Sequence, residues 1–350
     1  MKLEVASPTS PLNPLPRYPG PIWALLILAP FIAEVLSGST RLSFLFVLIP
    51  EVMVWGCGAL LCRELARRWH AGATSLLMLG LALSIAEEFI IQQTSIAPLP
   101  FAGVNADFGR YFGVNWLYLL FMLGFESVWV VLVPVQVAEL FFPDRRELPW
   151  LRKRGIIATC IAFLAGCCIA WYGWTQQARP RLNAAPYQPP MLAIVLAVAS
   201  IALFIASAWL LRGYGHSGKV ASRQAPRPQL LGLTAFILST PWFWLIGLLF
   251  VPHHGLNVWI PVSVGVIWSL LSFALLRYWS AGCDWRDIHR WAISFGAVLG
   301  SMALGDTSAA GWTHLDLIAK FAFQMLAVVG LVMIAKKVWQ REAVDHSQRP

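Results

Sequence analysis

The chain has 350 residues, of which 58% are hydrophobic and only 12% are charged, with a formal net charge of +9. A soluble protein carries roughly 25% charged residues, so this composition excludes a soluble enzyme or binding domain. The apolar residues fall in blocks of roughly 20, the length of a helix that crosses about 30 Å of hydrocarbon. They do not alternate with polar residues as the strands of a membrane barrel would. We therefore predict an all-α, polytopic helical membrane protein.

The apolar blocks predict about ten transmembrane helices. They are expected at 21–37, 42–62, 72–93, 114–138, 155–174, 190–211, 229–251, 257–276, 288–304 and 315–335. The first block is interrupted by Pro30 and Glu34 and is the least regular. The chain then divides into a disordered Pro-rich tail (1–20), an N-terminal bundle (21–211), a linker (212–228), an apolar C-terminal bundle (229–336) and a C-terminal tail (337–350).

The basic residues indicate the orientation. With the N-terminus in the cytoplasm, 21 of the 26 Lys and Arg residues lie on inner segments, and outer segments hold only Arg41, Arg110, Arg179 and Arg181. Such a bias follows the positive-inside rule, so the tails, the linker and both termini are expected to be cytoplasmic. The inner basic residues are expected to meet anionic lipid head groups, and no segment favours a nucleic-acid partner.

Five carboxylates fall inside the first four predicted spans: Glu34, Glu51, Glu87, Glu88 and Glu126. Carboxylates in lipid are costly and usually mark a binding or transport pathway. A helical rise of about 1.5 Å per residue places all five in the middle and outer parts of the bilayer. We therefore predict an outward-facing acidic cavity that takes a small cation, an amine or protons.

Two further residues are candidates for this cavity. Ser84, Glu88, Gln92 and Ser95 recur at helical spacing, which predicts one polar face on the third span and adds Gln92 to the site. Lys320 begins the last span and is the one basic residue inside a span, so it is the candidate counter-charge.

No metal or cofactor is expected. The six cysteines show no zinc-type spacing. The adjacent pair His253-His254 fits a solvated loop better than a metal site, because neighbouring histidines rarely point at one ion. The run Arg63-Glu64-Leu65-Ala66-Arg67-Arg68 is interpreted as a basic boundary of the second span, with a local helical pair between Glu64 and Arg68. Gly296 and Gly300 predict a close helix contact.

Three segments together resemble an uncharacterised group of bacterial multi-pass membrane proteins, over roughly residues 20–145. They are Pro50-Glu51 with Trp55-Gly56-Cys57-Gly58 and Arg63 to Trp69, then Glu87-Glu88, then Gly109-Arg110-Tyr111-Phe112-Gly113-Val114-Asn115-Trp116. The resemblance implies the bacterial inner membrane and no known activity.

Glu87-Glu88 is also similar to the opening of the Glu-Glu-x-x-x-Arg motif of the CAAX-protease/bacteriocin-processing intramembrane proteases. Gln92 stands where that family has Arg, while Phe250 with His254 and His253 with Asn257 match its later motifs in form. This resemblance implies an alternative, a divergent intramembrane hydrolase in which Glu87 or Glu88 activates water. A third hypothesis is a non-catalytic scaffold or assembly factor whose carboxylates only specify helix packing.

Overall fold

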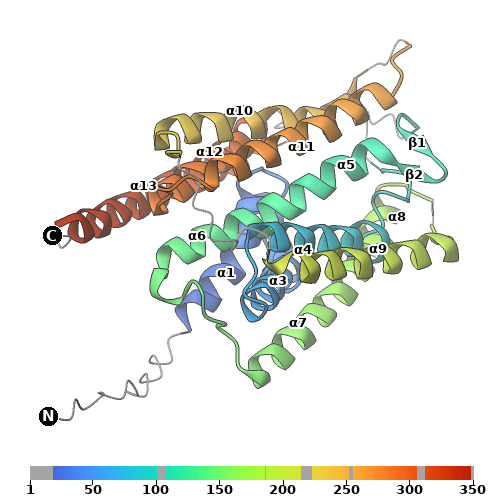
Figure 1. Ribbon diagram of the computed structural model, residues 1–350. Coiled ribbons are helices and arrows are strands. Elements are labelled where there is room, and N and C mark those ends of the chain that lie inside the picture. Colours follow the sequence, from blue (N-terminus) through green and yellow to red (C-terminus); the bar gives the residue numbers. More distant parts are fainter. Residues whose placement is uncertain are drawn as a thin grey trace, which may run out of the picture.

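Helical segments form at each of the ten predicted positions. The computed structural model in Figure 1 is 79% helical and describes residues 19–100, 107–185, 187–213, 223–251, 255–305 and 312–347. Among these residues, eight helices are long and apolar enough to cross a membrane: Leu42–Arg68, Ala73–Ile91, Trp116–Phe141, Lys153–Arg181, Met191–Gly213, Pro228–Phe250, Trp259–Ser280 and His314–Val344.

Two other helical segments occupy the places of the first and ninth predicted spans. Gly20–Val35 is apolar but shorter. The helix Asp287–Gly305 begins with Asp287, His289 and Arg290, so it is less apolar than the other eight. The helical, multi-pass membrane architecture is therefore confirmed. The count of ten spans and the cytoplasmic position of both termini stay predictions.

The N-terminal half contains α1 (Gly20–Pro30), η1 (Phe31–Val35), η2 (Leu42–Val47), α2 (Leu48–Glu51), η3 (Val52–Gly56), α3 (Cys57–Arg68), α4 (Ala73–Ala86), η4 (Glu87–Ile91), α5 (Trp116–Phe125), η5 (Glu126–Leu132), α6 (Val133–Phe141) and η6 (Pro143–Arg145). The second half contains α7 (Lys153–Trp171), η7 (Tyr172–Ala178), α8 (Arg179–Arg181), α9 (Met191–Leu210), η8 (Leu211–Gly213), α10 (Pro228–Gly247), η9 (Leu248–Phe250), α11 (Trp259–Ser280), α12 (Asp287–Gly305) and α13 (His314–Ser347).

Two of these spans form the centre of the bundle. The apolar window of Ala73–Ile91 is 67% buried and that of Trp116–Phe141 is 61% buried, whereas the windows of Lys153–Arg181 and Met191–Gly213 are each 11% buried. The peripheral helices present long apolar side chains outward, as lipid-facing helices do. The carboxylates of the third and fourth spans therefore lie on the two helices with the most protein around them.

Glycines bring the central helices close together. A Cβ atom at Gly80 would lie 2.9 Å from the Cα atom of Ser127, so α4 and η5 approach more closely than a larger residue would permit. In the second half, Gly296 and Gly300 pack against the backbone and side chains of α10, which confirms the predicted helix contact. One hydrophobic core includes residues from both halves, and the predicted division into two bundles stays a prediction.

A short hairpin precedes the fourth span, where the sequence predicts helix from residue 114. β1 (Arg110–Tyr111) pairs antiparallel with β2 (Val114–Asn115), and the helix begins at Trp116. The side chain of Asn115 accepts a hydrogen bond from the Tyr118 amide at 3.0 Å. Asn115 thus caps the helix, because its side chain satisfies one of the backbone donors that a helix start leaves open.

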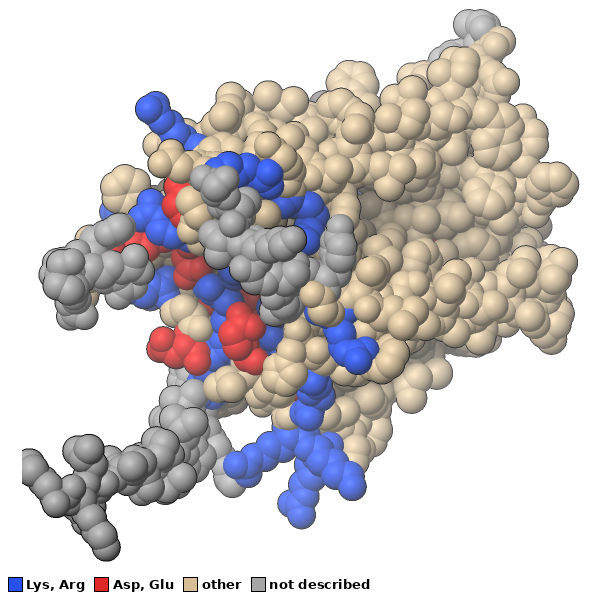
Figure 2. Space-filling model, viewed as in Figure 1, with Lys and Arg blue, Asp and Glu red and all other residues tan. Residues whose placement is uncertain are grey.

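The charged side chains gather at one end of the molecule. Figure 2 shows blue and red residues at the end where α6 and α13 finish, and an almost uniformly tan surface toward the opposite end. This distribution follows the predicted loop asymmetry. The N-terminal tail up to residue 18, residues 214–222 of the linker, the pair His253-His254 and residues 348–350 lie outside the described residues.

Candidate functional site

The structure brings the five predicted carboxylates together. Glu87, Glu88 and Glu126 are at most 1% exposed, and Glu51 is 3% exposed. Glu126 lies within electrostatic reach of Glu87, Glu88 and Glu34. Glu34 in turn lies within reach of Glu51 and Glu87. We call these five residues the acidic cluster.

Each carboxylate of the acidic cluster lies in or beside a π-helical turn. Glu34 belongs to η1, Glu87 and Glu88 begin η4, and Glu126 begins η5. Glu51 directly precedes η3. Such wide turns are rare and are frequent at functional sites, because they displace a side chain from the regular helical face.

Prolines account for part of this geometry. Pro30 directly precedes η1, Pro50 lies two residues before η3, and Pro134 lies two residues after η5. A proline has no backbone N–H and its ring clashes with the carbonyl four residues before it, so regular α-helical bonding is lost there. The carbonyl four residues before Pro134 is that of Val130, within η5, so we attribute the wide turn at Glu126 to Pro134. The turn η4 has no proline and lies at the end of its helix.

Hydroxyl groups from two loops bind the cluster. Thr40 donates a hydrogen bond to Glu51. Glu88 accepts hydrogen bonds from Thr94 at 2.8 Å and from Ser95 at 2.6 Å. The sequence predicts Ser95 on a helical face shared with Glu88, and this is wrong: the helix ends at Ile91 and the chain turns back. Gln93 makes that turn with a positive φ of 62°, which no hydrophobic periodicity indicates.

Two members of the cluster lack such partners. Among the described residues, neither carboxylate oxygen of Glu87 or of Glu126 accepts a hydrogen bond. Ser84 lies beside Glu126, and the half-buried Gln92 lies beside Glu87, without reaching hydrogen-bond geometry. The buried phenol of Tyr118 adjoins Glu88 and Glu126. Tyr118, Thr40 and Thr94 are missing from the sequence prediction, because each is an ordinary residue of its helix or loop until the fold brings it to the cluster.

The loop 92–99, which follows η4, covers the cluster at Glu88. Arg110 donates to the carbonyl oxygens of Ile96 at 2.8 Å and Ala97 at 2.9 Å, and Arg179 donates to that of Pro98 at 2.8 Å. The backbone amide of Asn115 donates to the Ser95 carbonyl at 2.8 Å. Two of the four predicted outer arginines thus hold the loop in place. The structure shows a closed cluster, and the outward opening of the predicted cavity stays a prediction.

Lys320 lies where α13 meets the loop after η1, and its role as the counter-charge of the cluster stays a prediction. Lys320 is 3% exposed, its ammonium lies 4.9 Å from the centre of the Trp312 ring, and it adjoins Gly38 in the loop after η1. Its neighbour Gln324 donates to the Leu36 carbonyl at 3.3 Å. Lys320 therefore helps to attach α13 to the loop that carries Thr40. Among the described residues, no group of three or more His, Cys, Asp or Glu side chains has the arrangement of a metal site.

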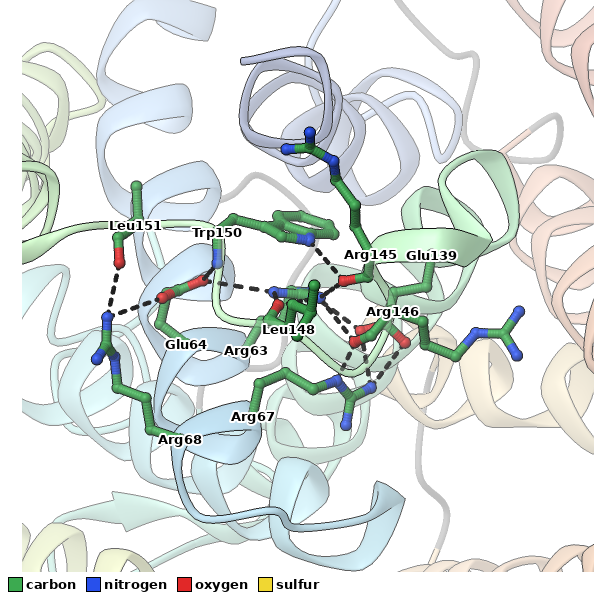
Figure 3. Close-up of polar contacts among 10 residues, drawn as sticks. All are labelled: Arg63, Glu64, Arg67, Arg68, Glu139, Arg145, Arg146, Leu148, Trp150 and Leu151. Atoms are coloured by element: carbon green, nitrogen blue, oxygen red, sulfur yellow. Dashed lines mark hydrogen bonds and ion pairs between the residues drawn. The ribbon is translucent and has the colours of Figure 1, made fainter. Parts of the chain in front are cut away.

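A second group of buried charges lies at the opposite ends of the same helices. Arg63 is fully buried and donates to Glu139 at 3.0 Å (Figure 3). Arg67 donates to both oxygens of Glu139 at 2.7 Å. The predicted pair of Arg68 with Glu64 is present at 3.5 Å. We call Arg63, Glu64, Arg67, Arg68 and Glu139 the arginine network.

The arginine network holds the loop between α6 and α7. Arg63 donates to the backbone carbonyls of Arg145, Arg146 and Leu148, and its guanidinium stacks 3.3 Å from the centre of the Trp150 ring. The backbone amide of Trp150 donates to Glu64 at 2.6 Å (Figure 3). Sequence reasoning missed Glu139, because the residue comes one position after the predicted end of the fourth span. Because each carboxylate of the arginine network is paired with an arginine, we interpret the network as structural.

Comparison with known proteins supports the membrane assignment. The model of the Uncharacterized membrane protein family matches residues 24–341. The chain belongs to this family. No curated protein and no solved structure matches the chain.

The residues matched by the family model include every residue of the acidic cluster and of the arginine network. The predicted resemblance to an uncharacterised membrane family is thereby confirmed. The similarity to the CAAX-protease/bacteriocin-processing proteases is not shown by the comparisons.

Proposed function

We propose that this chain is a transporter-like protein of the bacterial inner membrane that binds a small cation or amine at the acidic cluster. The observation that carries the proposal is the convergence of Glu87 and Glu126 without hydrogen-bond partners among the described residues. A charge buried without a partner costs far more than a fold can supply. The cluster must therefore hold protons or a cation, and exchange of one for the other is the chemistry such a site offers.

The surroundings of the cluster favour exchange over permanent neutralisation. The wide helical turns η4 and η5 leave the backbone around Glu87 and Glu126 less regular than an α-helix. The loop 92–99 places Thr94 and Ser95 directly on Glu88, so movement of that loop would change the coordination of the cluster. A protein that binds a cation in a closed site needs such a movable cover.

A scaffold role is supported less well. In a scaffold, the carboxylates would each be bound to backbone groups or to a basic side chain, as they are in the arginine network. Glu87 and Glu126 have no such partner on the described part of the chain. Buried groups of this kind lower stability and are typical of sites that bind something else. The hydrolase alternative gains no support, because the comparisons do not show the protease similarity.

Binding is tested first with purified protein. We expect methylammonium, Na⁺ or Li⁺ to raise the thermal stability of the wild-type protein. A ligand at about ten times its dissociation constant stabilises by about 1.4 kcal/mol. The double variant Glu87→Gln, Glu126→Gln is expected to lose this response. Glu147→Gln is the matched control, because Glu147 is exposed on the loop after η6.

Transport is then tested in proteoliposomes with the ion that binds. Uptake driven by an outward proton gradient, lost in the double variant and kept in Glu147→Gln, would support exchange. If no cation or amine stabilises the wild-type protein, or if the double variant responds like the wild type, the proposal is wrong.

A further inference from the structure

A surface groove is lined by residues from the end of α6 and the last turns of α13. Figure 1 shows that these two helices finish at the same end of the molecule. The groove encloses about 570 Å³, within the range of roughly 300–1,000 Å³ that is typical of ligand sites. Its apolar walls come from Leu140, Phe141 and Ile334. Lys337, Arg341 and Asp144 supply its charges. The acidic cluster and the arginine network contribute no residue to it.

The two basic residues are positioned by α6. Arg341 donates to the carbonyl oxygen of Leu140 at 3.1 Å, one of the last carbonyls of α6, which the helix itself leaves without a partner. A guanidinium has five N–H donors, and among the described residues Arg341 uses one in a hydrogen bond. Lys337 is exposed, and its ammonium lies 6.0 Å from the centre of the Phe141 ring. Arg341 and Lys337 therefore each have N–H donors that can bind a ligand in the groove.

Apolar side chains of α13 are exposed near the groove. Met333, beside the groove-lining Ile334, is 55% exposed, and Trp339 is 62% exposed on another face of the same helix. Exposed Trp near the end of a span is typical of the membrane interface. A ligand in this groove would hold its polar end against Lys337 and Arg341 and could extend an apolar chain along α13. Free phosphate, in contrast, would contact only Lys337 and Arg341 and would make no contact along α13.

We propose that the groove binds the head group of an anionic phospholipid, of the phosphatidylglycerol type. The phosphate would lie between Lys337 and Arg341, since basic pockets between membrane helices bind such head groups on the cytoplasmic side. The exposed carboxylate of Asp144 on the rim would accept a hydrogen bond from a glycerol hydroxyl. Two cations against one carboxylate leave the groove with a positive charge that complements an anionic lipid.

Native mass spectrometry of delipidated, full-length protein tests this directly. Phosphatidylglycerol is expected to bind more tightly than phosphatidylcholine. The double variant Lys337→Gln, Arg341→Gln is expected to weaken binding of phosphatidylglycerol about 30-fold, and Lys337→Gln alone about fivefold. The single variant keeps the Arg341 bond to α6, so it separates a binding defect from a folding defect.

Lys336→Gln is the matched control, because Lys336 is an exposed lysine on the same helix and does not line the groove. It is expected to change binding by less than about twofold. Equal binding of phosphatidylglycerol and phosphatidylcholine would overturn the proposal, and so would wild-type affinity in the double variant. A Lys336→Gln defect as large as that of Lys337→Gln would show only a general surface attraction, and would also overturn it.

Discussion

Two groups of buried charge occupy opposite ends of the same two helical spans. Leu42–Arg68 carries Glu51 in its first half and Arg63 near its end, and Trp116–Phe141 carries Glu126 near its middle and Glu139 in its last turn. In the arginine network, each carboxylate has an arginine within 3.5 Å. In the acidic cluster, Glu87 and Glu126 have no such partner among the described residues. Burial of charge alone therefore does not distinguish a structural group from a candidate site, whereas pairing does.

The backbone differs between the two groups as well. The arginine network lies on the regular helices α3 and α6, and the acidic cluster lies on the wide turns η1, η4 and η5 and next to η3. Regular helices hold side chains at fixed spacing, which suits a permanent network. Wide turns occur most often where function requires a displaced side chain.

Removing Arg63 is expected to have the largest effect on stability. Arg63→Met removes one of the two arginines that bind the buried carboxylate of Glu139, and it leaves three backbone carbonyls without their arginine donor. Breaking a buried charge pair in this way costs about 3–5 kcal/mol. The measurement is the free energy of unfolding in mixed micelles. Arg68→Met is the control: its side chain is 39% exposed, and such pairs contribute about 0–1 kcal/mol. Equal losses in both variants would contradict a structural role specific to Arg63.

Removing Arg110, which holds the loop 92–99, is expected to have the next largest effect, confined to the acidic cluster. Arg110→Gln removes charged hydrogen bonds to the carbonyls of Ile96 and Ala97, which are together worth about 2 kcal/mol. Amide hydrogen exchange in residues 92–99 should then accelerate about 30-fold. Exchange in the arginine network should not change. Arg181→Gln is the control, because Arg181 is exposed and bonds only Gln177, at 3.4 Å, among the described residues. No acceleration in Arg110→Gln would show that the loop is held by other contacts.

Neutralising a carboxylate should change the free energy of unfolding in opposite directions in the acidic cluster and in the arginine network. Glu87→Gln is expected to raise the free energy of unfolding by about 1 kcal/mol without ligand, since sites that bind other molecules are kept at a cost in stability. The matched comparison is Glu139→Gln, which should destabilise, because it removes the charge that Arg63 and Arg67 bind. Destabilisation of similar size in both variants would remove the distinction between the two groups.

The smallest expected effect is a pH dependence at the charged end. Burial would raise the pKa of Asp287, but the hydrogen bond and charge of Arg146, at 2.7 Å, outweigh it and hold this pKa below its usual value. A depressed pKa in the folded protein stabilises above the unfolded value of about 3.9 and loses that contribution as the pH falls below it. Thermal stability should therefore drop less between pH 5 and pH 3 in Asp287→Asn than in the wild type. Asp144→Asn, on an exposed residue, should behave as the wild type does.

Particular residues show where sequence reasoning stops. The five carboxylates were identified from their position in apolar blocks, because a charge among lipid-facing residues stands out in composition alone. The sequence predicts Ser95 on a helical face and does not predict Thr94 at the cluster, because the turn at Gln93 depends on the loop being held by Arg110 and Arg179. The sequence predicts Lys320 as the counter-charge of the cluster. The fold places its ammonium over the Trp312 ring, which the sequence does not indicate, and the counter-charge role stays a prediction.

The sequence by itself determined the class of protein, the positions of its helices and the presence of buried charge. Apolar blocks of the right length can satisfy their backbone groups in lipid only as helices, and this rule is local. Only the tertiary structure decided which charges are paired. Glu139 and Arg63 are 76 positions apart, and Glu126 and Glu34 come from different spans. Pairing at such separations depends on how the helices pack, and packing here depends on close approaches such as that of Gly80 to Ser127.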